Sequence, residues 1–344
     1  MKDKLVNFEI LRIVLALGIV ANHIIMYSGK VSNIETGFDY YLTNMFRSFL
    51  VYAVNIFILM SGYFTIKFSY RKILRIEIKV LIYTYLFLIL NLCFNIVEVN
   101  GVKYIYMLFP TITKQYWFIS IYFVLCIFSD FINKTLDVLT KKEYDILILI
   151  EIIIYYILPT FCYVINAPQI IQDAGYGIVN FVCLYTFGYY IRKYMVHYKN
   201  VKLYIILYFV VSLMMFISNI GLSKLLGFYF DSFISYNTIF CLFGSVLIFL
   251  IFKNINIIKN KYIVKVSSKC LIVYIIHMNP IISEFLFKSI LKVQNYHGVY
   301  LVFAILIIPI VIYIICTLID DVIEFILKNV LKLIRGKYYG QFYN

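Results

Sequence analysis

Charged residues are scarce along this chain, and their scarcity excludes most classes of soluble protein. Asp, Glu, Lys and Arg account for 14% of the 344 residues, whereas soluble domains carry about 25%. Glycine and proline, with 14 and 5 residues, rarely interrupt the chain. Hydrophobic residues make up 63% and lie in long blocks that short charged segments separate. The composition therefore predicts an integral membrane protein.

Closely spaced cysteines are also missing. None of the seven cysteines belongs to a Cys-x-x-Cys motif, and most lie inside apolar blocks. An odd number without close pairs does not suit a disulfide framework or a metal site, so we interpret them as small buried hydrophobic residues and expect no metal. No small-residue cleavage site follows the first apolar block. We therefore predict that this block is the first transmembrane helix and not a cleaved signal peptide.

Ten apolar blocks are long enough to cross a hydrocarbon layer of about 30 Å as helices. They are residues 8–27, 45–65, 77–97, 116–133, 145–165, 175–193, 202–220, 234–252, 269–288 and 300–320. The connecting segments are short, and neither an internal repeat nor a separate soluble domain is recognisable. The sequence thus predicts an all-α integral membrane bundle of about ten transmembrane helices, with residues 1–344 forming one multi-pass domain.

Basic residues alternate in density between successive connecting segments. With the N-terminus in the cytoplasm, the segments on the cytoplasmic side contain 23 Lys and Arg residues, and those on the outer side contain seven. This bias follows the positive-inside rule and predicts that both termini are cytoplasmic. Topology and anionic lipid headgroups also account for the net charge of +14, so we expect no nucleic-acid partner. The Ile-, Tyr-, Lys- and Asn-rich composition points to a bacterial plasma membrane.

The first block, FEILRIVLALGIVANHI, carries ionisable residues at membrane depth. Arg12 and His23 are eleven residues apart, close to three helical turns, so both lie on one face with an axial separation of about 16 Å. Glu9, three residues before Arg12, is placed to pair with it. Ionisable residues at this depth usually mark a functional site. The alternative is that Arg12 extends to the headgroups while His23 makes only an interhelical hydrogen bond.

A basic cluster follows the second block, where the sequence reads SGYFTIKFSYRKILR. Arg71, Lys72 and Arg75 fall within about one helical turn and share a broad face. Guanidinium groups bind phosphate through paired hydrogen bonds, so this cluster is suited to holding a phosphorylated ligand. Ordinary positive-inside charge is the simpler interpretation.

Two further positions stand out in the later blocks. His277 lies near the middle of the ninth block, and Asn279 and Pro280 directly after it predict a kinked helix. This second polar point at membrane depth favours a functional His277, with a structural hydrogen bond as the competing explanation. Trp117, the only tryptophan, lies at a predicted outer interface, where we expect it to belong to an aromatic belt.

These features, in this order, resemble the acyltransferase 3 family of integral membrane O-acyltransferases over nearly the whole chain. Glu9, Arg12 and His23 match the acidic residue and the R-x10-H pattern of the family's first helix. The stretch IFILMSGYF matches the phenylalanine-rich Ser-Gly end of its second helix, and the tryptophan-bearing fourth helix is similar. The basic cluster matches a family R-x-x-R motif in which Lys72 replaces the first arginine. YIIHMNP matches the late Y-x-x-H-P pattern, with two residues inserted between His277 and the proline.

The resemblance implies transfer of an acyl group, commonly acetyl from cytoplasmic acetyl-CoA, to a carbohydrate hydroxyl. Many family members carry an appended extracytoplasmic domain. This chain looks like the stand-alone members that acetylate capsular or exopolysaccharide units. The expected partners are then acyl-CoA, a free or lipid-linked carbohydrate acceptor, and membrane lipids.

The resemblance also implies roles for individual residues. His23 is the candidate base for the sugar hydroxyl, since an imidazole with a usual pKa of about 6.5 accepts protons near neutral pH. Alternatively, His23 accepts the acetyl group itself as a nucleophile. Arg12, oriented by Glu9, would meet the donor near the cytoplasmic boundary. The basic cluster would hold the CoA phosphates, and His277 would bind acceptor or donor.

Two other classes of protein remain open at this stage. A transporter or flippase of a glycan or lipid-linked intermediate would also use buried polar residues on many helices, and Pro280 would then mark a broken helix. A non-catalytic membrane scaffold would use the same residues for packing. Turnover of acetyl-CoA separates the transferase from both alternatives.

Overall fold

The structure, a computed structural model, describes residues 6–34, 37–195, 200–255, 257 and 260–341. All regular secondary structure in these ranges is helical, which confirms the all-α class. The α-helices are α1 (Val6–Tyr27), α2 (Phe38–Leu50), α3 (Ala53–Tyr63), α4 (Tyr70–Phe94), α5 (Gly101–Leu108), α6 (Trp117–Val138), α7 (Lys141–Glu151), α8 (Leu158–Val164), α9 (Ile178–Tyr194), α10 (Val201–Leu226), α11 (Ile239–Asn254), α12 (Lys261–Ser267), α13 (Cys270–His277), α14 (Ile282–Glu284) and α15 (Gly298–Gln341). Short π- and 3-10 segments are η2 (Ile152–Ile157), η3 (Ser232–Ile234), η4 (Phe285–Ile290) and η5 (Val293–Asn295).

Seven helical stretches in the described part of the chain are long and apolar enough to cross a membrane. They are Val6–Tyr27, Phe38–Tyr63, Trp117–Val138, Lys141–Val164, Val201–Leu226, Ser232–Asn254 and Gly298–Val330. Each coincides with one of the ten blocks predicted from the sequence. The other three blocks fall on α4, on the 17-residue α9 and on a bent helix pair. A multi-pass membrane protein is therefore supported, while ten crossings and a cytoplasmic N-terminus stay predictions.

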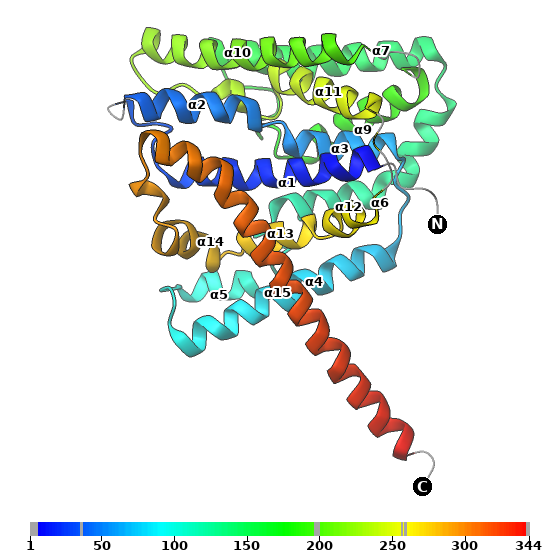
Figure 1. Ribbon diagram of the computed structural model, residues 1–344. Helices are drawn as coiled ribbons and strands as arrows, with labels where there is room; N and C mark the ends of the chain where they lie inside the picture. Colours follow the sequence, from blue (N-terminus) through cyan, green and yellow to red (C-terminus); the bar gives the residue numbers. More distant parts are fainter. Residues whose placement is uncertain (1–5, 35–36, 196–199, 256, 258–259, 342–344) are drawn as a thin grey trace.

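Helix α1 runs through the middle of the bundle (Figure 1). Helices α2, α3 and α11 contact it on one side, and α12, α13 and α15 on the other. The first half of α1, with Phe8, Leu11 and Leu15, belongs to a buried cluster shared with α3, α9 and α11. The second half, with Val20 and Ile24, belongs to a second cluster shared with α13 and α15. One face of α1 is thus buried by protein along most of its length.

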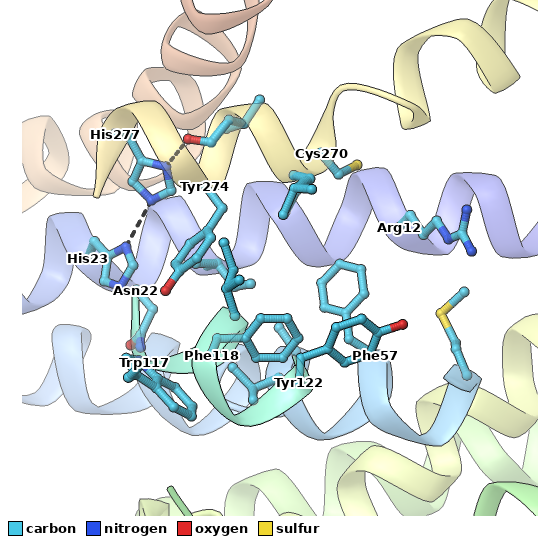
Figure 2. Close-up of a pocket in the computed structure, with 18 of the residues that line it drawn as sticks. Arg12, Asn22, His23, Phe57, Trp117, Phe118, Tyr122, Cys270, Tyr274 and His277 are labelled. Atoms are coloured by element: carbon cyan, nitrogen blue, oxygen red, sulfur yellow. Dashed lines mark hydrogen bonds between the residues drawn. The ribbon is translucent and has the colours of Figure 1, made fainter. Parts of the chain in front are cut away.

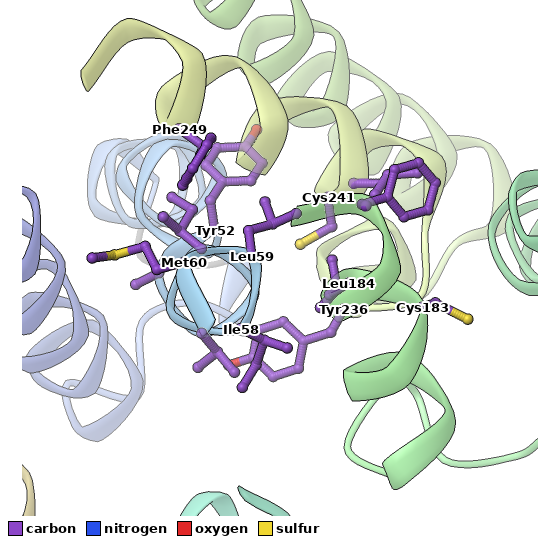
Figure 3. Close-up of a cluster of buried hydrophobic side chains, with 14 of the residues drawn as sticks. Tyr52, Ile58, Leu59, Met60, Cys183, Leu184, Tyr236, Cys241 and Phe249 are labelled. Carbon is purple, nitrogen blue, oxygen red and sulfur yellow. The ribbon is translucent and has the colours of Figure 1, made fainter. Parts of the chain in front are cut away.

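Helices α3 and α9 approach each other closely because each has a glycine against the backbone of the other helix. A Cβ atom on Gly62 would lie 2.0 Å from the Tyr185 carbonyl oxygen, and one on Gly188 would lie 2.1 Å from that of Leu59. Small residues are the usual means by which membrane helices pack backbone to backbone. Leu59 of α3 and Leu184 of α9 lie in the same buried cluster (Figure 3). This pair forms one fixed wall of the bundle.

The ninth predicted block is broken into two arms instead of forming one helix over 269–288. The stretches Lys261–His277 and Ile282–Asn295 meet at an angle of 93°. Pro280 has no N–H, and the Asn279 N–H turns to the Ile276 carbonyl, which leaves the Ile275 carbonyl without a helical donor. The Tyr116 hydroxyl donates to that carbonyl at 3.1 Å. The kink predicted from the proline is confirmed, and the break leaves His277 at the end of α13.

Candidate active site

Helices α1, α3, α6 and α13 enclose a cavity of about 790 Å³ (Figure 2). Its walls are mostly apolar and aromatic, with a small number of polar side chains, which is the usual composition of a small-molecule site. Arg12 lies at one end, here called the arginine end. His23 and His277 lie at the other, here called the histidine end (Figure 2). The prediction that Arg12 and His23 share one helix face is confirmed, because both line this cavity.

The two histidines contact each other directly. Nδ1 of His23 lies 3.0 Å from Nε2 of His277, although the two residues are 254 positions apart in sequence. His277 is 1% exposed, and its own Nδ1 lies 2.5 Å from the Val273 carbonyl oxygen. In the described part of the chain, no Asp, Glu or Cys joins them to form a cluster that could hold a metal ion. The sequence suggested that His277 faces the same cavity, and the structure adds the hydrogen bond.

This chain of contacts determines which nitrogen of His23 is basic. A carbonyl oxygen only accepts hydrogen bonds, so Nδ1 of His277 carries a hydrogen and donates it to Val273. The Nε2 atom of a neutral His277 is then an acceptor, and His23 donates to it from Nδ1. The lone pair of His23 is therefore on Nε2, for which no described residue serves as partner. His23 is thereby oriented as a proton acceptor toward the cavity that it lines.

At the arginine end, Glu9 and Arg12 form the predicted ion pair, with 3.4 Å between Nη1 and Oε1. The Ser267 hydroxyl, at the end of α12, donates to the other carboxylate oxygen of Glu9. Glu9 is buried, whereas the Arg12 side chain is 38% exposed. The buried carboxylate thus anchors a guanidinium group that remains available to a ligand.

Aromatic side chains separate the two ends of the cavity. Phe57 of α3, with Phe118 and Tyr122 of α6, lies between Arg12 and the histidines (Figure 2). The Phe118 ring centroid is 6.4 Å from that of Phe57 and 5.9 Å from that of Tyr122. We call these three residues the aromatic middle. A ligand that joins the two ends would pass through an apolar, ring-lined space.

The basic cluster is not gathered at this cavity. Arg71 and Arg75 line a separate cavity of about 440 Å³ between α4 and α15, together with Lys79 and Glu324. Lys72 lines neither cavity, but its charge interacts with Cys126 of α6. The face that the three basic residues share is therefore divided between two sides of α4.

Four residues at the histidine end were not predicted as site residues from the sequence. They are Asn22, Arg47, Tyr176 and Tyr236, all of which line the cavity. Trp117 was assigned to an aromatic belt, yet its side chain lies inside the cavity beside Asn22 (Figure 2). Only Asn22 had a signal in the sequence, as a polar neighbour of His23 in an apolar run. The others converge from separate elements, so no local spacing connects them.

The fold and the site define a multi-pass helical membrane protein in which one cavity is lined by an arginine and a histidine pair. The model of the acyltransferase 3 family, described as an acyltransferase domain, matches residues 5–318. This chain belongs to that family, as its resemblance predicted, and it is a membrane acyltransferase. No curated protein and no solved structure matches it significantly.

Proposed function

We propose that the chain moves an acetyl group from cytoplasmic acetyl-CoA to a hydroxyl of a cell-envelope carbohydrate, such as a capsular or exopolysaccharide unit. One observation supports this most directly: a single cavity contains Arg12 at one end and a histidine pair at the other. The two ends are separated by about 16 Å along α1. That separation is comparable to the length of an extended pantetheine arm, which connects the phosphates of CoA to its thioester.

The walls of the cavity suit such a donor. The pantetheine arm is narrow and uncharged, and the aromatic middle offers it an apolar path. The phosphates would remain at the arginine end, where Arg12 is partly exposed and the charge of Lys72 acts on Cys126 of α6. Arg71 and Arg75 would then act on the nucleotide only if it extends over α4. A dry thioester path also limits hydrolysis.

His23 would act as the base in the direct reaction. Its Nε2 takes the proton of the acceptor hydroxyl as the hydroxyl oxygen bonds to the thioester carbonyl carbon. The C–S bond then breaks, and the CoA thiolate leaves and takes the proton back from His23 as a thiol. His277 holds the imidazolium through the Nδ1–H of His23. In the alternative sequence of steps, Nε2 itself bonds to the acetyl carbon as the C–S bond breaks and the CoA thiolate leaves. The acceptor hydroxyl oxygen then bonds to that carbon, the N–C bond breaks, and the hydroxyl proton passes to the released Nε2.

The two sequences of steps differ in a covalent intermediate. Purified protein incubated with labelled acetyl-CoA and no acceptor should retain label at His23 only if His23 is the nucleophile. Mass spectrometry of the peptide that contains residues 12–23 measures this directly.

The experiment that tests the proposed function measures the acetyl content of surface glycan by mass spectrometry. A deletion strain is complemented with wild type, His23→Ala or His297→Gln at matched membrane expression. His297 lies outside the cavity and pairs with Asp39, so it is the matched control. We expect wild type and His297→Gln to restore acetylation and His23→Ala to lose at least a hundredfold. Full restoration by His23→Ala would show that the assignment is wrong.

The bent helix pair is the feature that would favour a transporter, because broken helices line many transport paths. The family match favours the transferase. In the same deletion strain, a transporter would change the amount of glycan at the surface and leave its acetylation unchanged.

A further inference from the structure

Three aromatic rings gather at the histidine end. The Trp117 ring centroid lies 4.6 Å from that of Tyr176 and 6.1 Å from that of Tyr236, and the two tyrosine rings are 4.9 Å apart. Tyr236 is buried, whereas Tyr176 is about half exposed. Sugar rings bind to surfaces of this kind, because their C–H groups pack against aromatic faces while their hydroxyls bond to polar groups at the side.

Two polar side chains, Arg47 and Asn22, line the cavity beside these rings. Arg47 donates from Nη1 to Asp231 at 2.7 Å and to the Tyr229 hydroxyl at 3.0 Å. Its charge acts on the Tyr176 and Tyr236 hydroxyls as well. Asp231 offsets that charge, so Arg47 serves this end of the cavity as a hydrogen-bond donor more than as a free cation.

Each of these two side chains leaves a buried polar atom without a partner. They are Nε of Arg47 and Oδ1 of Asn22, and both residues line the cavity. Buried polar atoms are costly to leave without a hydrogen-bond partner, so these two atoms call for a ligand or a water molecule. Nε needs an acceptor and Oδ1 needs a donor. A hydroxyl supplies both, whereas a carboxylate supplies only acceptors.

We infer that the histidine end is an acceptor subsite for an uncharged sugar ring, which packs on Trp117, Tyr176 and Tyr236 and bonds to Arg47 and Asn22 through its hydroxyls. This inference rests on the proposed function and adds the charge class of the acceptor. Asn22 and His23 both line this end of the cavity, so a ring bound to Asn22 would lie near the imidazole of His23 (Figure 2).

The single tryptophan makes this subsite directly observable. Trp117 is the only source of selectively excited tryptophan fluorescence in the chain. Purified full-length protein in lipid nanodiscs is titrated, without acetyl-CoA, with methyl glycosides of a hexose, an N-acetylhexosamine and a hexuronic acid. We expect a saturable change with at least one neutral glycoside and binding at least tenfold weaker for the uronide. A uronide that binds as well, or no response to either neutral sugar, overturns the inference.

A sharper test asks whether a variant can shift the preference of the subsite from neutral toward charged sugars. Asp231→Asn leaves Arg47 as an unpaired cation, so the uronide should gain affinity relative to the neutral glycoside by about tenfold. Arg47→Lys and Asn22→Ala should each weaken neutral-glycoside binding about tenfold. Arg192→Lys is the control, because Arg192 bonds to Thr65 and does not line the cavity. Unchanged binding in Arg47→Lys and Asn22→Ala contradicts the subsite.

The proposed transferase activity and the proposed sugar subsite can be disproved independently of each other. Sugar binding at Trp117 without any acetyl transfer leaves the subsite standing and overturns the transferase. Acetyl transfer to a sugar that never alters Trp117 fluorescence leaves the transferase standing and overturns the subsite.

Discussion

The carbonyl oxygen of Val273 decides, through His277, which nitrogen of His23 is free to take a proton. Each hydrogen bond in this chain has only one possible direction once the carbonyl is recognised as an acceptor. In the proposed reaction His277 therefore acts as a positioning residue, because it orients His23 through this hydrogen bond.

Two replacements of His277 should distinguish its role in orienting His23 from a role in packing alone. His277→Ala removes the acceptor for the His23 Nδ1–H, so we expect kcat to fall about a hundredfold while the KM for acetyl-CoA is unchanged. His277→Gln places an amide oxygen near the lost Nε2 and should restore most of kcat. Steady-state kinetics on purified protein measure both. Equal losses in the two variants would contradict the orienting role.

Residue spacing predicted the part of the site that comes from one helix. Glu9, Arg12 and His23 are related by the helical period, so their common face followed from the sequence. The contact between His23 and His277 did not, because it depends on how α1 and α13 pack. Arg47 was not singled out by any motif, and Trp117 was assigned to an aromatic belt. Their convergence is a tertiary property that no local pattern encodes.

At the scale of elements, the break after α13 depends on one tyrosine. Tyr116 donates to the Ile275 carbonyl and accepts from the Asn279 side chain at 3.0 Å. The side-chain oxygen of Asn279 in turn accepts from the Ile281 N–H. Backbone groups freed within a membrane need such partners, because no water replaces them.

Tyr116→Phe should therefore destabilise the break. It leaves a carbonyl and an amide without partners, for which we expect a loss of about 1–3 kcal/mol and a lower melting temperature. His277, two residues after Ile275, should also lose its register with His23, so kcat should fall as well. Tyr106→Phe is the matched control, because Tyr106 is exposed on α5. Thermal unfolding of both variants in detergent makes the comparison, and equal melting temperatures would exclude this role for Tyr116.

The sequence also located most elements and predicted a kink at Pro280, but it did not predict a full break of that helix into two stretches. The length of an apolar block predicts that a helix forms. It does not predict where distant side chains form hydrogen bonds to backbone groups and allow the helix to break. Pro280 predicted a kink, whereas the 93° bend also needs Asn279 and Tyr116. Long helices are thus predictable from local composition, and their interruptions depend on distant partners.

At the scale of the whole molecule, the orientation is open to a direct measurement. Ser32 and Lys142 are both exposed and lie in segments predicted to face opposite sides. In a Cys93→Ser background, a membrane-impermeant maleimide applied to intact cells should label Ser32→Cys and leave Lys142→Cys unlabelled. Permeabilised cells should label both. Labelling of Lys142→Cys alone in intact cells would reverse the predicted topology.

The aromatic middle has a consequence for the membrane in which the chain resides. A membrane voltage is lost where a water-filled path lets protons or ions cross between the two faces. Phe57, Phe118 and Tyr122 line the space between the two polar ends of the cavity with aromatic faces that offer water almost no hydrogen bonds. Water and the charges that it carries are therefore disfavoured along the path that joins the two ends.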